Sequence, residues 1–599
     1  MGFQTLLVVP LGFVVLCLFT FLKTNLLYQI DIWNKSLEKE PPTLPYSIPW
    51  LGHAFGFLTP VPGRFFSQML SWYSKEHGGA SMKLAGRNVR LIFSTTAVQA
   101  LLRVRHDVAN SDTMVKDMMS KGMKMGEADL ATYFQNRHLE HEVNNKFLLR
   151  PHAADVLLGQ FHRFMKHGLL EESIRLSTTP AATQTQTQTQ TQMGEAVDLY
   201  KWVRTIMFKA SAPSMFGERL LAEYPNIVRE FWDFEYLFLD LVFGVPRWVA
   251  SKPHVALEKV IEGLTAWIEA NDADTMGGKE VAPDPGMPDQ DWEPRWGSRL
   301  VRARQQLFQQ LGLSPRGRAS MELAMLFGLN SNAVPAIGWM LMHILDPRKP
   351  DLLPRIMQEI QEAVDVAADK DGEGELDLDF DLATLISQPL LQSIFQEVLR
   401  LYNDVLITRG VHQDLRLPTE DSQTTLLLKK GTIAMAPSYV NHHDPTGYGG
   451  APVDEFDPER FLVPTGQANT TSDGNDICSN NDAFDDEKTS SSSTTANTKR
   501  ASQKPYAFSP GAAGAKMIPF GGGRTMCPGR VFAKREVFSA LALVLLHFEI
   551  TPLAGPTSYR IPGHVASYTG SGIIGHGGDV KVHIKKRQTS PSDKFRTGR

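Results

Sequence analysis

A glycine-rich loop around a single cysteine constrains this chain more than any other feature of its sequence. Residues 519–530 read Pro-Phe-Gly-Gly-Gly-Arg-Thr-Met-Cys-Pro-Gly-Arg, and a long apolar segment follows. Glycines allow tight turns and let the backbone approach a flat cofactor. Pro528 suits the first position of a helix, so Cys527 lies near a helix N-terminus that favours a thiolate. The loop therefore predicts thiolate chemistry; the alternative is a glycine-rich turn holding a buried structural cysteine.

The cysteines and the net charge exclude several other kinds of protein. Cys17 lies in an apolar run, Cys478 in a polar low-complexity tract and Cys527 in the loop, so the chain offers neither a disulfide framework nor zinc-site spacing. We therefore expect a reducing compartment. The formal net charge is -4, and without an overall positive field we expect no nucleic-acid partner.

The N-terminus carries an uncharged apolar segment, residues 6–22. At 1.5 Å per residue a helix of this length reaches about 26 Å, the short end of a membrane span. A cleaved signal peptide is the alternative, but a basic n-region and a small-residue cleavage site are both missing. Lys23, Lys35 and Lys39 follow the segment and no basic residue precedes it, so the positive-inside rule places the rest of the chain in the cytosol.

These observations divide the chain into four parts. Residues 1–28 form the single-pass anchor, and the proline-rich residues 29–53 form an extended hinge, although an ordinary linker has the same composition. Residues 54–585 form one catalytic domain, and residues 586–599 a basic tail. Low-complexity insertions near residues 178–194, 271–298 and 466–504 are too polar to bury much area, so we expect them to be mobile.

Apolar periodicity predicts a mainly α domain with a small β portion. Helices are expected over residues 128–150, 197–216, 227–242, 320–345, 352–366, 382–402 and 531–548. Strands are expected over residues 89–93, 406–410, 424–428 and 580–584, and a glycine-rich hairpin over residues 569–585.

The cysteine loop resembles the haem-binding signature of the cytochrome P450 superfamily. Phe520, Gly523, Cys527 and Gly529 follow the spacing F-x-x-G-x-x-x-C-x-G. The resemblance implies the cytochrome P450 fold as a single catalytic domain behind a transmembrane helix. It also implies haem b with Cys527 as the axial iron ligand, since a thiolate pushes electron density toward bound dioxygen. One departure is Thr525, where the family commonly places an arginine or histidine that meets a haem propionate.

Further residues are assigned by the same resemblance. Glu397 and Arg400 lie three apart on one helix face, an arrangement that alone is usually a solvated ion pair. Arg460 lies in Phe-Asp-Pro-Glu-Arg-Phe, which resembles the family's P-E-R-F segment. The three are therefore expected to form a structural network behind the haem, fully paired because desolvating charges is costly.

Three arginines are candidates for the haem propionates. Arg409 lies in a predicted strand where family members often place a propionate-binding arginine. Arg524 precedes Thr525 in the cysteine loop. Arg137, with His138, lies on the predicted helix over residues 128–150, and ordinary surface residues are the alternative for this pair.

Residues 323–336 resemble the helix that crosses the distal face of the haem. Most family members carry an acid and an alcohol there that relay protons to oxygen, and this chain has neither. Residues 332–336 read Asn-Ala-Val-Pro-Ala, which resembles the branch that holds sterol 7α-hydroxylases and prostacyclin synthase. Pro335 cannot donate to the carbonyl of Ser331 and is expected to kink the helix, so that Ser331 and Asn332 order water near oxygen. The alternative is that Pro335 only shapes the pocket.

Three functional hypotheses follow. The first is a haem-thiolate monooxygenase that oxidises a lipophilic small molecule at the endoplasmic reticulum membrane, with electrons from NADPH through NADPH–cytochrome P450 reductase. The second, if proton supply is poor, is an isomerase acting on a peroxide without external electrons. The third is a haem sensor or electron carrier.

The insertions and the distal helix are similar to filamentous-fungal members that act on terpenoid, steroid-like or polyketide secondary metabolites. Substrate contacts are expected from the hairpin residues Gly570, Gly572, Ile573 and Ile574. A cluster of aromatic residues is the candidate roof of the pocket, with core packing as the alternative: Phe231, Trp232, Phe234, Tyr236, Phe238, Phe243 and Trp248.

Overall fold

The computed structural model describes residues 2–33, 38–54, 78–178, 195–242, 244–276, 291–369, 379–421, 424–448, 452–465, 504–510, 516–563 and 571–587. Most of the predicted insertions 178–194 and 466–504, residues 277–290 of the insertion 271–298, and most of the basic tail lie outside these residues. Cys478, Phe243 and Gly570 also lie outside them. The two ends of the insertion 271–298 are ordered, in α12 and in β6 and β7.

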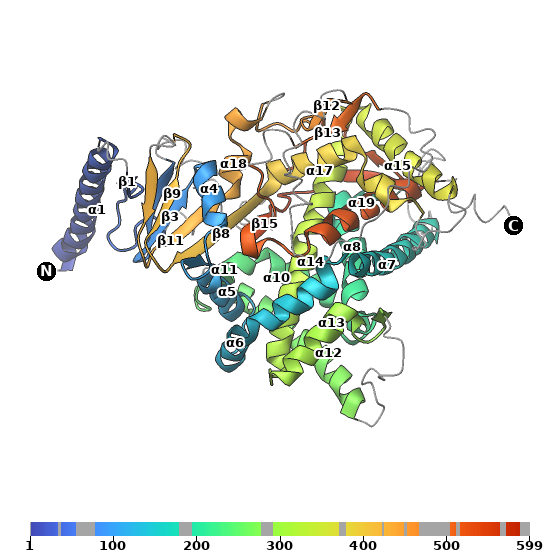
Figure 1. The fold of residues 1–599 in the computed structure, drawn as a ribbon, viewed down its shortest axis with the longest axis horizontal. Helices are drawn as coiled ribbons and strands as arrows, with labels where there is room; N and C mark the ends of the chain where they lie inside the picture. The colour runs from blue at the N-terminus through green and yellow to red at the C-terminus, as the bar shows by residue number, and fades with distance from the viewer. Residues whose placement is uncertain are drawn as a thin grey trace, which may run out of the picture.

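Helices make up most of the described chain, as the periodicity predicts (Figure 1). The α-helices are α1 Gly2–Trp33, α4 Thr95–Leu102, α5 Asp112–Asp117, α6 Glu127–Asn144, α7 Pro151–Thr178, α8 Leu199–Phe216, α9 Arg219–Glu223, α10 Ile227–Tyr236, α11 Phe238–Val242, α12 Ser251–Met276, α13 Arg299–Gln310, α14 Pro315–Ile344, α15 Leu352–Asp369, α16 Leu382–Ile386, α17 Pro389–Tyr402, α18 Ser438–His442 and α19 Arg530–His547. The π-helical turns η2 Met118–Gly122 and η3 Asn145–Leu149 extend α5 and α6.

The strands are short and fall into several small sheets. They are β1 Glu38–Lys39, β2 Gly79–Leu84, β3 Arg87–Ile92, β4 Ala109–Asn110, β5 Glu195–Asp198, β6 Trp292–Glu293, β7 Gly297–Ser298, β8 Asn403–Val411, β9 Leu415–Pro418, β10 Thr425–Leu428, β11 Ile433–Pro437, β12 Leu462–Pro464, β13 Tyr506–Phe508, β14 Phe548–Pro552, β15 Ser571–Ile573 and β16 Lys581–Lys586. The largest sheet has the order β15-β8-β11-β3-β2, and β4 also pairs with β8.

The helix α14 is the axis around which the other helices pack. It contacts α8, α12, α17 and α19, and nearly every residue in its second half is buried. Ser314 caps it through a bond from the N–H of Gly317, and Pro315 occupies its first turn. These cap residues explain why α14 begins earlier than its periodicity predicts.

A buried charge cluster joins α14 to two other helices. Arg304 on α13 pairs with Glu322 on α14 at 3.4 Å and with Glu140 on α6, and Gln305 donates to Glu322 at 2.7 Å. Arg304 and Glu322 are fully buried, so their charges need this pairing. The cluster fixes α6, which carries Arg137, against α14.

Three sequence expectations differ from the structure. The single helix predicted over residues 227–242 is two helices, because α10 ends at Tyr236 and α11 begins at Phe238. The single helix predicted over residues 382–402 is two helices, because α16 ends at Ile386 and Pro389 opens α17 at its first turn. The hairpin predicted over residues 569–585 is wrong: β15 pairs with β8, whereas β16 pairs with β14 and β5. Each strand finds its hydrogen-bond partners in a different sheet.

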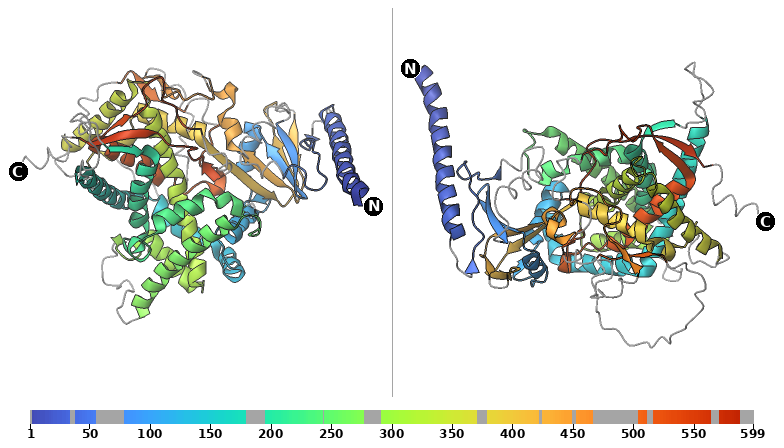
Figure 2. Two further views of the ribbon diagram at one scale, coloured as in Figure 1. Left: turned by 180° about the vertical axis from the view of Figure 1, so that it is seen from behind. Right: turned by 90° about the horizontal axis from the view of Figure 1, so that it is seen from above.

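The apolar helix α1 stands beside the sheet at one end of the molecule (Figures 1 and 2). Residues 10–33 are long and apolar enough to cross a membrane, with mean hydropathy 1.8. The helix runs to Trp33, beyond the end of the predicted anchor. Its last turns contact the domain, since Tyr28 is buried and the Thr24 hydroxyl is within 3.1 Å of both the N–H and the carbonyl oxygen of Tyr46.

The proline-rich segment after α1 is extended and bonded to the sheets. The strand β1 pairs in parallel with β10, and Leu44 donates its N–H to Ser81 at 2.9 Å. His53 bridges this segment and β2, because its Nε2 contacts the carbonyl oxygen of Pro45 and its Nδ1 accepts from the N–H of Lys83.

Candidate active site

The cysteine loop is a closed turn ahead of α19. The N–H of Cys527 donates to the carbonyl oxygen of Phe520 at 3.0 Å. The N–H of Met526 donates to the carbonyl oxygen of Gly523 at 3.1 Å. Gly523 has φ +63°, and a Cβ there would collide with the backbone carbonyl oxygen of Leu102. This position therefore requires glycine.

Cys527 is accessible to solvent, although the surrounding protein partly desolvates its thiol. Its side chain is exposed, although burial raises the pKa of the thiol. The N–H groups of Gly529 and Arg530 and the charge of Arg530 act in the opposite direction. These opposing contributions are those expected for a cysteine just before a helix, but desolvation outweighs them in the free thiol.

Two buried side chains hold the start of the loop. Asn403 donates from Nδ2 to the carbonyl oxygen of Pro519 at 3.2 Å, and His442 Nε2 accepts from the N–H of Ile518 at 3.1 Å. Neither residue is predicted from the sequence. An asparagine after a helix and a histidine in a short helix carry no local pattern that points to a partner so far along the chain.

Glu397, Arg400 and Arg460 meet in one buried network. Glu397 accepts from Arg400 Nε at 2.7 Å and Nη2 at 2.9 Å, and from Arg460 Nε at 3.0 Å. Arg400 Nη1 donates to the backbone oxygen of His442 at 3.0 Å. The network therefore also supports α18, the helix whose His442 side chain accepts from the N–H of Ile518. All three side chains are at most 1% exposed, so a solvated surface pair is excluded.

Of the three candidate arginines, Arg409 lies in contact with the cysteine loop. Its Nη2 donates to the hydroxyl of Thr525 at 2.6 Å, and its Nη1 donates to the carbonyl oxygen of Thr408 at 2.9 Å. It is 8% exposed and makes no ion pair with any described residue. Arg524 is exposed. Arg137 is half-buried and pairs with Asp112 at 2.6 Å.

The polar side chains of the distal helix, Ser331 and Asn332, already have hydrogen-bond partners. The Ser331 hydroxyl donates to the carbonyl oxygen of Phe327 at 2.6 Å. Asn332 Oδ1 accepts from the N–H of Ile573 in β15 at 2.9 Å, and its Nδ2 is 3.5 Å from Ser331 Oγ. Pro335 is buried inside the helix. The structure therefore places Ser331 and Asn332 side by side and adds a contact to β15 that the sequence does not indicate.

Comparisons with known proteins agree with this geometry. The model of the family described as Cytochrome P450 matches residues 324–484 and 501–563. Cytochrome P450 monooxygenase fsoE of Humicola fuscoatra is 27% identical over 92% of this chain and 88% of that protein. Cytochrome P450 monooxygenase efuG of Hormonema carpetanum is 27% identical over 92% and 91%. The cholesterol 7-alpha-monooxygenase of Cricetulus griseus is 26% identical over 65% and 66%.

The chain belongs to the cytochrome P450 family. It is an oxidoreductase of the monooxygenase type, and the family implies a haem-thiolate centre. The expected branch is confirmed, because a sterol 7α-hydroxylase is among the relatives of this cytochrome P450.

The residues around Cys527 fit a haem. Cys527 is exposed, so its sulfur is accessible to a ligand. Arg409 is a buried cation that uses two of its five N–H donors and has no described carboxylate within pairing distance. Because a buried charge needs a partner, an anionic group such as a propionate satisfies it. Arg409 thus reaches the loop at Thr525, where the family commonly has an arginine or histidine.

The described aromatic residues proposed as a roof divide into three groups: those that contact α14, those in the core, and those exposed to solvent. Phe234 and Phe238 contact Phe327 of α14, with ring centroids 6.2 and 4.3 Å apart, respectively. Phe231 and Trp232 are buried beside Phe208, so they are core residues. Tyr236 and Trp248 are exposed, at 58% and 87%, which contradicts a place for them in an enclosed roof.

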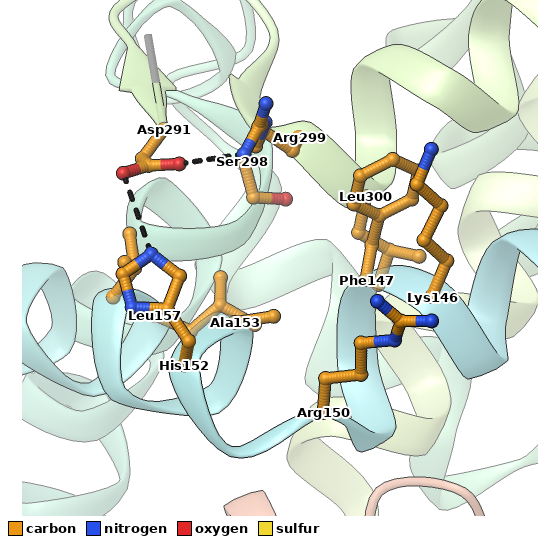
Figure 3. A pocket seen from close by; sticks show the side chains of 11 residues that line it. Lys146, Phe147, Arg150, His152, Ala153, Leu157, Asp291, Ser298, Arg299 and Leu300 are labelled. Carbon is orange, nitrogen blue, oxygen red and sulfur yellow. Dashed lines mark hydrogen bonds and ion pairs between the residues drawn. The ribbon is translucent and has the colours of Figure 1, made fainter. Parts of the chain in front are cut away.

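A separate pocket of about 230 Å³ lies between η3, the start of α7 and α13 (Figure 3). Asp291 contacts His152 and Arg299 on one side, while Lys146 and Arg150 stand on the other. None of the residues that line it belongs to the cysteine loop or the distal helix.

Proposed function

We propose that this cytochrome P450 oxidises a lipophilic secondary metabolite, with Cys527 as the axial ligand of haem b. The observation that carries the proposal is the position of Cys527: it is exposed on a loop held by Asn403 and His442. When bound, haem supplies the activation of dioxygen at an iron that carries a thiolate ligand.

The other site residues are proposed to hold and orient the cofactor. The N–H groups of Gly529 and Arg530 face the sulfur and stabilise negative charge on it. Arg409 would bind one propionate, and Arg524, which is exposed on the loop, is the candidate partner of the other. Phe520 and Gly523 shape the loop. The network of Glu397, Arg400 and Arg460 keeps the loop in place.

The ligand assignment is tested by the reduced carbon-monoxide difference spectrum. We expect the wild-type protein to show the red-shifted band of a thiolate-ligated haem, and Cys527→Ser to lose it. Cys17→Ser is the matched control, because Cys17 lies in α1, remote from the loop. An unchanged band in Cys527→Ser contradicts the proposal.

The proposed electron donor is a membrane-bound NADPH–cytochrome P450 reductase, with the enzyme anchored in the endoplasmic reticulum membrane and its domain in the cytosol. The apolar α1 and the lysines that follow it support this orientation. Turnover that requires both NADPH and the reductase is the expected result.

The proposed substrate is terpenoid, steroid-like or polyketide. The fungal relatives fsoE and efuG and the cholesterol 7-alpha-monooxygenase support a lipophilic substrate. The phenylalanines that α10 and α11 place against Phe327 supply an apolar surface beside the distal helix. Metabolite profiles before and after gene deletion test this assignment, and an unchanged lipophilic fraction contradicts it.

A second candidate function is the isomerisation of a peroxide without external electrons. It is favoured by the bonds that occupy the Ser331 hydroxyl proton and Asn332 Oδ1, since both are then unavailable to pass protons. Turnover of a lipid hydroperoxide without NADPH or reductase is the result that would select it over the monooxygenase.

A further inference from the structure

Among the described residues, the side chain of Asn332 makes the hydrogen bond that joins the distal helix to β15. We infer that Asn332 is a positioning residue that sets where β15 lies over the active site, and through it how a substrate is oriented. This inference rests on the proposed function, because it takes α14 and β15 as walls of the substrate pocket.

The contact between Asn332 and β15 is close and leaves no room for variation. Asn332 Oδ1 accepts from the N–H of Ile573 at 2.9 Å. Gly572 has φ +138°, and a Cβ there would collide with Asn332 Oδ1. A glycine at this position lets the backbone of β15 approach the amide. Any larger residue at position 572 would have to displace the Asn332 amide from this bond.

On its other side β15 is bonded to the strand that supports the cysteine loop. Ser571, Gly572 and Ile573 pair with residues 405, 404 and 403 of β8. Asn403, the partner of Ile573, donates to the carbonyl oxygen of Pro519 at 3.2 Å. Ile573 is thus bonded to α14 through Asn332 and linked to the Cys527 loop through Asn403. These two links fix its position between the helix and the loop.

The segment that follows Ile573 is buried and has hydrogen bonds of its own. Ile573 and Ile574 are 5% and 4% exposed, and the N–H of Ile574 donates to the carbonyl oxygen of Tyr402 at 2.6 Å. Trp339 Nε1 donates to the carbonyl oxygen of Ile574 at 2.8 Å. The segment after Ile573 is anchored by these bonds, whereas Asn332 makes the side-chain bond to β15 itself. Loss of the Asn332 bond therefore frees the side of β15 that faces α14 and leaves its pairing with β8 in place.

The link also changes the role of Asn332. One acceptor site of the Asn332 amide oxygen is used by β15, and its Nδ2 is directed toward Ser331. Asn332 acts on the reaction through Ile573, whereas the role suggested by sequence is direct ordering of water.

The first test compares two variants of nearly equal size. Asn332→Asp keeps an acceptor for the N–H of Ile573, and Asn332→Leu removes it. We expect hydrogen exchange in the peptide containing Ile573 to become about fivefold faster in Asn332→Leu and to stay near wild type in Asn332→Asp. Asn226→Ala, at an exposed asparagine before α10 without a side-chain capping bond, is the control.

The second test uses the haem-loaded protein and two azole probes that bind iron on the substrate side. We expect Asn332→Leu to change the Kd of 4-phenylimidazole about fivefold and that of imidazole less than about twofold, since only the larger probe reaches β15. Asn332→Asp restores the wild-type ratio. The shift of the haem absorption band gives both constants.

A double-mutant cycle completes the test. Gly572→Ala forces a methyl group against Asn332, so it changes the 4-phenylimidazole constant more in the wild-type background than in Asn332→Ala. Gly555→Ala is the matched control, because a Cβ at Gly555 meets nothing within 4 Å.

The outcomes separate this inference from the proposed function. Unchanged exchange and an unchanged azole ratio in Asn332→Leu overturn the positioning role even when the carbon-monoxide band is normal. An altered ratio in both Asn332→Leu and Asn332→Asp also overturns it, because the acceptor is then not what matters. Loss of the band in the wild-type protein removes the proposed function, whatever the exchange data show.

Discussion

The three candidate arginines differ in the partners their charges already have. Arg137 is paired with Asp112, and Arg524 is exposed to solvent, which stabilises a cation without a partner. Arg409 is buried and bonded only to neutral oxygens. A buried cation gains most from a bound propionate, so the three side chains should contribute unequally to holding the haem.

Arg409→Gln should therefore release haem faster than wild type by about tenfold or more, because a hydrogen bond to a charged group contributes about 1.5–3 kcal/mol. Arg524→Gln and Arg137→Gln should change the rate by less. Transfer of haem to apomyoglobin measures the rates. Equal rates in all three variants contradict the assignment of Arg409.

Two buried carboxyl groups should make stability depend on pH. Burial raises the pKa of Glu536 to about 8, although a bond from Ser211 lowers it, and burial raises the pKa of Asp404 to about 7. Both folded-state pKa values lie above those of the unfolded chain, so the contribution of these groups is complete at low pH and is lost as pH rises through 7 and 8.

The free energy of unfolding should thus fall between pH 6 and pH 8.5 in urea titrations. Glu536→Gln should flatten the upper part of this decline, because the amide does not ionise. A decline of the same steepness in Glu536→Gln would show that another group causes it.

At the scale of elements, the buried network on α17 is the feature whose disruption costs most. Glu397→Gln leaves Arg400 and Arg460 buried without a negative partner, which should lower the free energy of unfolding by about 3–5 kcal/mol. Glu459→Gln is the matched control, because Glu459 pairs with Arg355 at the surface and should cost less than about 1 kcal/mol. Urea unfolding measures both, and equal losses contradict the buried network.

The helices were predictable because they carry strong local signals, and the errors had two sources, one local and one distant in the sequence. Pro389 is a local signal that separates α16 from α17, yet the apolar pattern runs through it. The strands β15 and β16 satisfy the pattern of a hairpin. The three-dimensional structure shows that they do not pair with each other: β15 pairs with β8, and β16 pairs with β14.

For the molecule as a whole, the same division applies to the site. Cys527, Glu397 and Arg460 lie in motifs that a few neighbouring residues define, so the sequence alone indicates them. Asn403 and His442 act on residues that are 116 and 76 positions away. Short-range patterns carry no information about such contacts.

The proposed anchor leads to a test on the intact protein. Residues 10–33 have mean hydropathy 1.8, so the protein should remain with membranes after alkaline carbonate extraction. Protease added to sealed microsomes should digest the domain, since it is proposed to face the cytosol. Release by carbonate, or protection from protease, contradicts the proposed topology.

The contact between α1 and the sheet has a consequence for how the enzyme meets its substrate. Tyr28 is 5% exposed, and Thr24 is bonded to Tyr46, so the last turns of α1 are fastened to the domain. These contacts restrict how the domain turns relative to α1. With α1 as the proposed membrane anchor, they would set the tilt and depth of the domain at the bilayer, and with them the side from which a molecule dissolved in lipid would enter.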